Sequence, residues 1–167
     1  MSSHLATLPA SDLNTVAVAG LAGGVPGLIA DLRSDHAGET GAVAIYLGIL
    51  AVSRDPQVRH FAREHLTTER AHLAQLGALL PPGQRSALLP LWRVAGWFTG
   101  FLPALIGARA VYATIEAVET FVDHHYEEQI RKLPAHGPGG ALRNCLMAWR
   151  WLVGSGSALA VKAARRV

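Results

Sequence analysis

The residue pair in this chain with the clearest chemical potential is Glu69 and His72, which lie three positions apart. In an α-helix this spacing places the carboxylate and the imidazole on the same face. Helical bundles that hold metal ions between carboxylates use Glu-x-x-His pairs of this kind, with both side chains pointing inward. The alternative is an ordinary pair on a solvated helix face, and the pair alone does not decide between the two.

A second carboxylate, Glu39, lies as far before a predicted turn near Arg54 as Glu69 lies after it. A helix rises 1.5 Å per residue, so in antiparallel helices both carboxylates would sit at the same height, about 22 Å from the turn. Glu116 or Glu119 on a later helix offers a third carboxylate. Oxygen ligands together with imidazole suit iron or manganese better than metals that prefer thiolates. Exposed surface positions are the alternative for each of these glutamates.

The elements that would position these residues are predicted to be helices. Apolar residues recur at helical spacing from Leu28 onward, and Asp55-Pro56 predicts the start of a second helix, because Asp is a good N-cap and Pro suits the first helical position. That helix is predicted to end near Leu80, before two prolines and a glycine. Residues 1–27, rich in Ala, Gly, Ser and Pro, are predicted to be a flexible arm, and residues 28–167 a single helical domain.

The second half of the chain is predicted to form a further helical pair. An aromatic, amphipathic stretch runs from Leu88 to Leu102, and a long helix is predicted to follow Pro103 and end near Leu133. A shorter helix is predicted from Ala141. No strand-like alternation is evident, so the predicted fold class is all-α, with two helix hairpins.

The composition favours contact with lipid or an apolar substrate. Half of the residues are hydrophobic and 16% are charged, below the roughly 25% that is usual for soluble domains. No acidic residue follows Glu128, whereas seven basic residues do, which is typical of a surface for anionic lipid head groups. No nucleic-acid-binding motif accompanies these charges, so nucleic acid is not an expected partner. The single cysteine, Cys145, excludes a Cys-rich metal site.

Aromatic side chains gather in the stretch before Pro103, at Trp92, Trp97, Phe98 and Phe101. The longest uncharged apolar run, residues 94–108, is shorter than the roughly 20 residues that cross a bilayer. This predicts a segment that lies at a membrane interface and gives access to an apolar substrate. A buried core helix is the alternative.

Three motifs occur in order along the chain. Residues 35–42 read Asp-His-Ala-Gly-Glu-Thr-Gly-Ala, residues 69–73 read Glu-Arg-Ala-His-Leu, and Ala117-Val118-Glu119 is followed by His125-Tyr126 and Gln129. Over about residues 30–133 these motifs resemble the demethoxyubiquinone hydroxylases, ferritin-like di-iron monooxygenases of ubiquinone biosynthesis. The resemblance implies a ferritin-like antiparallel helical bundle with an amphipathic membrane-docking segment.

The resemblance also implies a ligand set and a reaction. Glu39, Glu69, His72 and Glu119 match four of the family's six metal ligands, and the register of the match selects Glu119 rather than Glu116. Two iron ions are implied, with hydroxylation of a demethoxyubiquinone-type ring by oxygen and electrons from NADH. His36 and Tyr46 are predicted to support the ligands; for His36, a hydrogen bond to a buried carboxylate and a satisfied core position are both open.

The implied surroundings are those of a lipid-soluble substrate. The partners are an isoprenoid quinone, a membrane surface, and either other ubiquinone-biosynthesis proteins or a second copy of the chain. The implied location is peripheral, on the cytoplasmic face of a bacterial inner membrane.

One part of the family pattern is missing, the Glu-x-x-His of the fourth helix. No Asp or Glu follows Glu128, and the only later histidine is His136, in a loop rich in Gly and Pro. The height that matches Glu119 falls near residues 153–155, which read Val-Gly-Ser. The fourth helix is therefore predicted to be shortened, as though about 20 residues had been removed.

Several readings of this gap are open. The chain could be an active hydroxylase, a protein that binds one metal ion through the four remaining ligands, or one that borrows Asp123 or His124 as a ligand. A non-catalytic partner that binds quinone or lipid and has a degenerate metal site is the alternative function.

Overall fold

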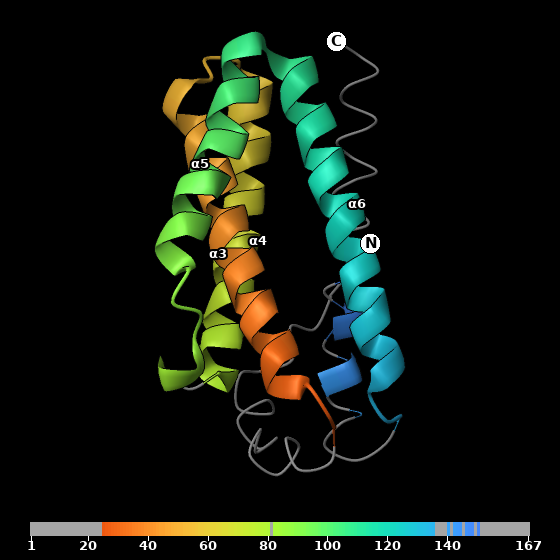
Figure 1. Ribbon diagram of the computed structural model, residues 1–167. Helices are drawn as coiled ribbons and strands as arrows, with labels where there is room; N and C mark the ends of the chain where they lie inside the picture. Colours follow the sequence, from red (N-terminus) through yellow and green to blue (C-terminus); the bar gives the residue numbers. More distant parts are fainter. Residues whose placement is uncertain are drawn as a thin grey trace.

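The computed structural model describes residues 25–80 and 82–135, and positions 140, 142–144, 146–148 and 150. All regular secondary structure in this part of the chain is helical (Figure 1). The helices are α3 (Leu28–Val52), α4 (Pro56–Leu79), the 3₁₀ turn η1 (Pro82–Gln84), α5 (Leu89–Ile106) and α6 (Ala108–Lys132). The predicted all-α fold class is therefore confirmed. The predicted N-terminal arm lies almost entirely outside the described residues.

The α3–α4 hairpin forms where the sequence predicted it. Asp55 caps α4, because its Oδ1 accepts hydrogen bonds from the backbone N–H groups of Gln57 at 2.8 Å and Val58 at 3.2 Å. Pro56 occupies the first helical position, where its missing N–H costs nothing. The hairpin therefore fixes the register between the residues of α3 and those of α4.

Helix α5 packs closely along α3 through glycines on both helices (Figure 1). A Cβ atom at Gly96 would collide with the carbonyl of Gly41, and one at Gly100 would collide with the carbonyl of Ile45. In the same way, a Cβ at Gly48 would collide with the backbone of α5. Any larger residue at these positions would separate the helices, so the glycines set the distance between α3 and α5.

The predicted helix break at Pro103 is wrong. Pro103 lies inside α5, and the break between α5 and α6 falls at Gly107. Proline clashes with the turn that precedes it but does not prevent the chain from remaining helical beyond it. Gly107 has a φ of 139°, a conformation that side chains with a Cβ rarely adopt, so the turn needs glycine there.

Two hydrophobic clusters lie at opposite ends of the bundle. Each takes residues from α3, α4 and α6, so the three helices are packed together above and below a middle layer. The first cluster contains Val25, Leu28, Leu32, Leu76, Leu79, Leu80, Tyr126, Ile130, Leu133, Leu142 and Leu146. The second contains Ile45, Tyr46, Ile49, Val58, Ala62, Leu66, Val111, Tyr112 and Ile115.

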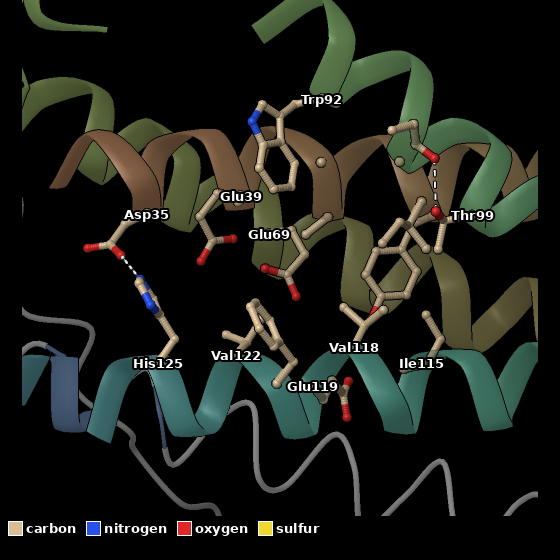
Figure 2. A pocket seen from close by; sticks show the side chains of 18 of the residues that line it. Asp35, Glu39, Glu69, Trp92, Thr99, Ile115, Val118, Glu119, Val122 and His125 are labelled. Carbon is tan, nitrogen blue, oxygen red and sulfur yellow. Dashed lines mark hydrogen bonds and ion pairs between the residues drawn. The ribbon is translucent and has the colours of Figure 1, made fainter. Parts of the chain in front are cut away.

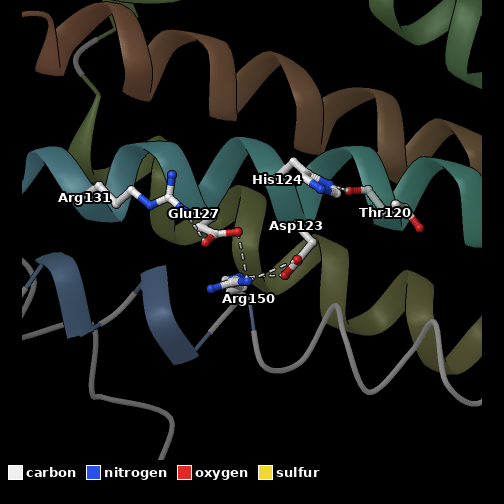
Figure 3. Close-up of polar contacts among 6 residues, drawn as sticks. All are labelled: Thr120, Asp123, His124, Glu127, Arg131 and Arg150. Atoms are coloured by element: carbon white, nitrogen blue, oxygen red, sulfur yellow. Dashed lines mark hydrogen bonds and ion pairs between the residues drawn. The ribbon is translucent and has the colours of Figure 1, made fainter.

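Of the residues described after α6, Arg150 lies against that helix. Its guanidinium donates to Asp123 at 2.7 Å and to Glu127 at 3.3 Å, and so ties this part of the chain to α6 (Figure 3). Residues 153–155, where the sequence predicts the gap in the fourth helix, lie outside the described residues. The predicted shortening of that helix therefore stays a prediction.

The outer face of α5 is apolar and exposed. Among the described helices, α5 alone is long and apolar enough to cross a membrane by length and composition, and 11% of it is buried within the protein. Its exposed apolar residues follow helical spacing and form one stripe. This stripe consists of Leu91, Val94, Phe98, Leu102, Leu105 and Ile106.

Replacement of Gly100 by alanine tests the close packing of α5 on α3. We expect Gly100→Ala to lower the free energy of unfolding by about 1–3 kcal/mol, because the new methyl group forces the two backbones apart. The matched control is Gly38→Ala on α3, where a Cβ meets no atom within 4 Å and alanine favours the helix. Urea unfolding followed by circular dichroism measures both, and equal stabilities of the two variants would contradict the packing argument.

Candidate metal centre

Three carboxylates and a histidine occupy the middle layer between the two hydrophobic clusters. Helix α3 contributes Glu39, α4 contributes Glu69 and His72, and α6 contributes Glu119. In Figure 2 the two carboxylates from α3 and α4 project toward α6. The clusters on either side hold the three helices in register, so the middle layer is closed to most solvent.

Glu39, Glu69 and His72 converge closely. One possible ligand atom from each of them lies within 4.8 Å of the others. Nδ1 of His72 is 3.4 Å from Oε2 of Glu69 and 4.0 Å from Oε1 of Glu39. Two carboxylate oxygens and one imidazole nitrogen at these distances make a suitable donor set for a divalent transition-metal ion.

Glu119, on α6, lines the same cavity as Glu39 and Glu69 and lies near a second histidine, His65. Its Oε1 lies 4.0 Å from Nδ1 of His65, and both side chains are largely buried. The ring of His65 stacks on Tyr46 at 5.5 Å between centroids and lies tilted against Phe61 at 4.2 Å. Glu116 is exposed, whereas Glu119 is buried.

The carboxylates are held in an environment that disfavours their negative charge. Burial raises the pKa of Glu39 well above its usual range, and the neighbouring Glu69 carboxylate raises it further. Burial also raises the pKa of Glu69, and the negative charge of Glu119 raises it further. Burial lowers the pKa of His72, which favours the neutral imidazole that binds metals. A bound cation would compensate the clustered carboxylates, so these residues fit a metal ion.

A tyrosine and a second polar cluster flank the carboxylates. The hydroxyl of Tyr126 donates to Oε1 of Glu39 at 2.7 Å. One turn away, Oδ1 of the buried Asp35 lies 2.9 Å from Nε2 of His125 and accepts from the amide of Gln129 at 2.6 Å. Burial raises the pKa of Asp35, whereas the hydrogen bond to Asp35 raises that of the less buried His125.

The two predicted supporting residues have different surroundings. Tyr46 lines the same cavity as the carboxylates, and burial, followed by Glu69 and Glu119, raises the pKa of its hydroxyl well above the usual value. His36 is buried, but within the described residues no hydrogen bond joins it to a carboxylate. The supporting role of His36 therefore rests on the sequence alone.

Asp123 and His124, which the sequence offered as substitutes for the missing ligands, make contacts outside the carboxylate group. Asp123 is paired with Arg150, and His124 is exposed, with Nδ1 2.8 Å from the carbonyl of Thr120 (Figure 3). His124 is five residues after Glu119 and points about 140° away from it, whereas Asp123, four residues after Glu119, shares that face but is held by Arg150. The suggestion that Asp123 or His124 replaces a missing ligand is therefore wrong for this arrangement.

A cavity of about 660 Å³ opens beside the carboxylates, between α3, α5 and α6 (Figure 2). Its walls are mainly apolar, and Glu39, Glu69 and Glu119 lie among its lining residues. Of the four aromatic residues predicted to give access, Trp92 lines this cavity. The other three pack with one another on α5, with Trp97 stacked on Phe101 at 4.5 Å and Phe98 set edge-on to both.

Several residues of this centre are not among the site residues predicted from the sequence. Tyr126 lies two helical turns after Glu119, and His65 lies one turn before Glu69, so helical spacing could have identified both. Asp35 and Gln129 belong to the motifs, but their contact joins residues 94 positions apart. No local pattern indicates such a pair.

Comparison with known protein families gives a match over most of the chain. Residues 28–164 match the family described as "Ubiquinone biosynthesis protein COQ7". The chain belongs to this family. Its helical bundle is therefore of the predicted ferritin-like class, and the resemblance found in the sequence is confirmed.

The chain is also similar to several curated proteins. It is 43% identical over 105 residues to the 3-demethoxyubiquinol 3-hydroxylase of Rhodospirillum rubrum, which covers 61% of this chain and 50% of the relative. It is 39% identical over 104 residues to the mitochondrial NADPH-dependent 3-demethoxyubiquinone 3-hydroxylase of Dictyostelium discoideum, covering 61% and 48%. The human protein of the same name is 37% identical over 109 residues, covering 64% and 50%. The chain spans about half the length of these curated relatives.

The contribution of Glu39 to the stability of the metal-free protein is expected to fall as pH rises. The folded-state pKa of Glu39 lies above its ordinary value of 4.5, so the folded protein holds this proton more tightly than the unfolded chain. Its contribution to stability is present below about pH 4.5 and is lost as pH rises through the folded pKa. Glu39→Gln stays neutral, so we expect it to be more stable than the wild type at pH 8 by at least about 1 kcal/mol.

Urea unfolding in the presence of a chelator, at pH 5 and pH 8, measures this difference. The control is Glu64→Gln on α4, whose side chain is 66% exposed. The expectation fails if Glu39→Gln and Glu64→Gln change stability equally at both pH values.

Proposed function

We propose that this chain hydroxylates the ring of a demethoxyubiquinone-type quinone at a metal centre formed by Glu39, Glu69, His72 and Glu119. The observation that carries the proposal is the position of the three carboxylates on the wall of a largely apolar cavity, with His72 beside Glu39 and Glu69. A metal centre at the wall of an apolar cavity suits an oxidation of an apolar substrate with water excluded. The names of the relatives, which describe hydroxylases of demethoxyubiquinone or its quinol, support the same reaction.

The metal is proposed to be iron. Glu39, Glu69 and His72 would hold one ion, and Glu119 would contribute to a second. When bound, iron supplies the reduction of oxygen that the ring hydroxylation needs. The protein holds the carboxylates in place by the two hydrophobic clusters and by the Tyr126 hydroxyl, which fixes one oxygen of Glu39.

The substrate ring is proposed to enter the cavity between α5 and α6. Trp92 from α5 and Val118, Phe121 and Val122 from α6 supply apolar surface at this entrance. An isoprenoid tail would remain along the apolar side chains outside it, where no polar group must be desolvated. Phe121 is 73% exposed, as expected for a residue that contacts a ligand or lipid.

The electron source is proposed to be a reduced nicotinamide dinucleotide. The names of the mitochondrial relatives specify NADPH for those proteins, whereas the sequence resemblance implied NADH. The assay for this chain therefore includes both.

The apolar stripe on α5 is proposed to dock the protein on a membrane surface. The stripe lies opposite the glycines that contact α3, so its exposure is a consequence of how α5 packs. Arg93 is exposed on the same helix and Arg109 just after it, where basic side chains can contact anionic head groups. A peripheral position on the cytoplasmic face of a bacterial membrane would bring the cavity entrance to the layer that contains isoprenoid quinones.

A second candidate function has an observation of its own. The absence of any carboxylate after Glu128 removes the ligands of the family's fourth helix from this sequence. Without a complete centre, the same cavity and the same α5 stripe would serve a non-catalytic partner that binds quinone or lipid. Such a partner could act beside other proteins of ubiquinone biosynthesis or as a pair of identical chains.

The decisive experiment is a hydroxylation assay. The protein is loaded anaerobically with Fe²⁺, mixed with a short-tailed demethoxyubiquinone and either NADH or NADPH, and exposed to oxygen. We expect hydroxylated product by mass spectrometry, reduced at least 100-fold in Glu69→Ala because that carboxylate is central to the centre. The control is Glu64→Gln, which we expect to retain wild-type activity.

The two candidate functions give different results. Quinone binding by the wild type with no product under either electron donor would contradict the enzyme and support the non-catalytic partner. Product formed equally by wild type and Glu69→Ala would contradict the assignment of this centre.

Membrane docking by α5 has a separate test. We expect Phe98→Glu combined with Leu102→Glu to reduce co-flotation with anionic vesicles by roughly 10-fold or more, because each change removes an exposed apolar side chain worth about 1.5–3 kcal/mol in lipid. The control is Leu47→Glu on α3, a leucine that is 40% exposed. Equal loss of flotation in both proteins would show that α5 has no special role.

A further inference from the structure

Helix α4 carries a second histidine that faces the centre, His65. It precedes Glu69 by one helical turn, and His72 follows Glu69 by another, so the two imidazoles flank one carboxylate on the same side of the helix. The side chain of His65 is 18% exposed, and its Nδ1 lies 4.0 Å from Oε1 of Glu119. This separation equals that between His72 and Glu39 in the first group of ligands.

The sequence explains why an additional imidazole matters in this chain. A centre with two ions needs nitrogen and oxygen donors on both sides, and beyond Glu128 the chain has no carboxylate and a single histidine, His136. Glu119 by itself would leave a second ion with few protein ligands. Within this sequence, α4 supplies an imidazole near Glu119, that of His65.

We propose that His65 and Glu119, with Glu69 shared between the two positions, hold a second divalent transition-metal ion beside the one bound by Glu39, Glu69 and His72. Bonds from such an ion to imidazole nitrogen and carboxylate oxygen are each about 2.1 Å long, so one ion spans donors up to about 4.2 Å apart. The 4.0 Å between His65 and Glu119 lies within this limit. Glu69 and Glu119 line the same cavity (Figure 2).

A further atom indicates that this group of side chains is built for cations. Oε2 of Glu39 has no hydrogen-bond partner among the described residues, although the side chain is only 5% exposed. Buried carboxylate oxygens are normally paired with a donor or a cation. The middle layer therefore has acceptor atoms in excess of the donors that the described helices supply.

The competing role for His65 is packing alone. Its ring lies between Tyr46 and Phe61, and an aromatic ring at this position would fill the same space without binding a metal. His65→Phe separates the two roles, because it keeps a ring for these contacts and removes the nitrogen. His60→Ala is the matched control, a histidine of the same helix whose side chain is 74% exposed.

The test is the stoichiometry of Co²⁺ binding to the full-length, metal-free protein, measured by isothermal titration and by the visible absorption of the bound ion. We expect two ions per chain in the wild type and in His60→Ala. We expect one ion in His65→Phe and one in His72→Phe, with different visible spectra because different ligand groups remain. Thermal unfolding of the metal-free variants shows that each is folded before titration.

The inference rests on the proposed function for the presence of a metal centre, and the outcomes separate the two. Two ions in both the wild type and His65→Phe, or one ion in both, would overturn the role of His65 and leave the first metal position standing. No bound ion in the folded wild type would overturn the metal centre itself. Loss of one ion in His65→Phe but not in His60→Ala would support the second position.

Discussion

The burial of three carboxylates in the middle of the bundle is the constraint on which the rest of this structure depends. Charged groups in such a position are strongly destabilising unless they are protonated or paired with a cation. Glu39, Glu69 and Glu119 remain there because hydrophobic clusters above and below them hold α3, α4 and α6 together. The apolar cores thus supply the stability that a chemically active but unfavourable middle layer requires.

Helix α5 meets two different requirements on its opposite faces. Its glycines allow it to lie against α3 with the backbones nearly in contact, and from this position its Trp92 reaches the cavity beside the carboxylates. Its outer face keeps an apolar stripe exposed, at a free-energy cost that an isolated soluble protein would avoid. The cavity lies between this helix and α6, and its access to the apolar surface follows from the same packing.

Local signals in the sequence predicted the helices well. The Asp55-Pro56 start of α4, its end near Leu80 and the helical pattern from Leu28 all rest on capping and periodicity, which act over a few residues. The error at Pro103 has a related cause, since proline inside the last turns of a helix is tolerated and the stronger signal was the glycine four residues later. The equal heights of Glu39 and Glu69 followed from the turn position alone, because helical rise is nearly constant.

The sequence by itself determined which residues could form the centre, because residue type and helical spacing decide which side chains share a face. Only the tertiary structure decided how those faces meet: that Asp123 pairs with Arg150, that Tyr126 donates to Glu39, and that His65 approaches Glu119. These contacts join separate helices whose relative rotation depends on packing throughout the bundle. Spacing along one helix carries no information about that rotation. The sequence could therefore predict the face of the helix on which each ligand lies, but not which residues of other helices would contact it.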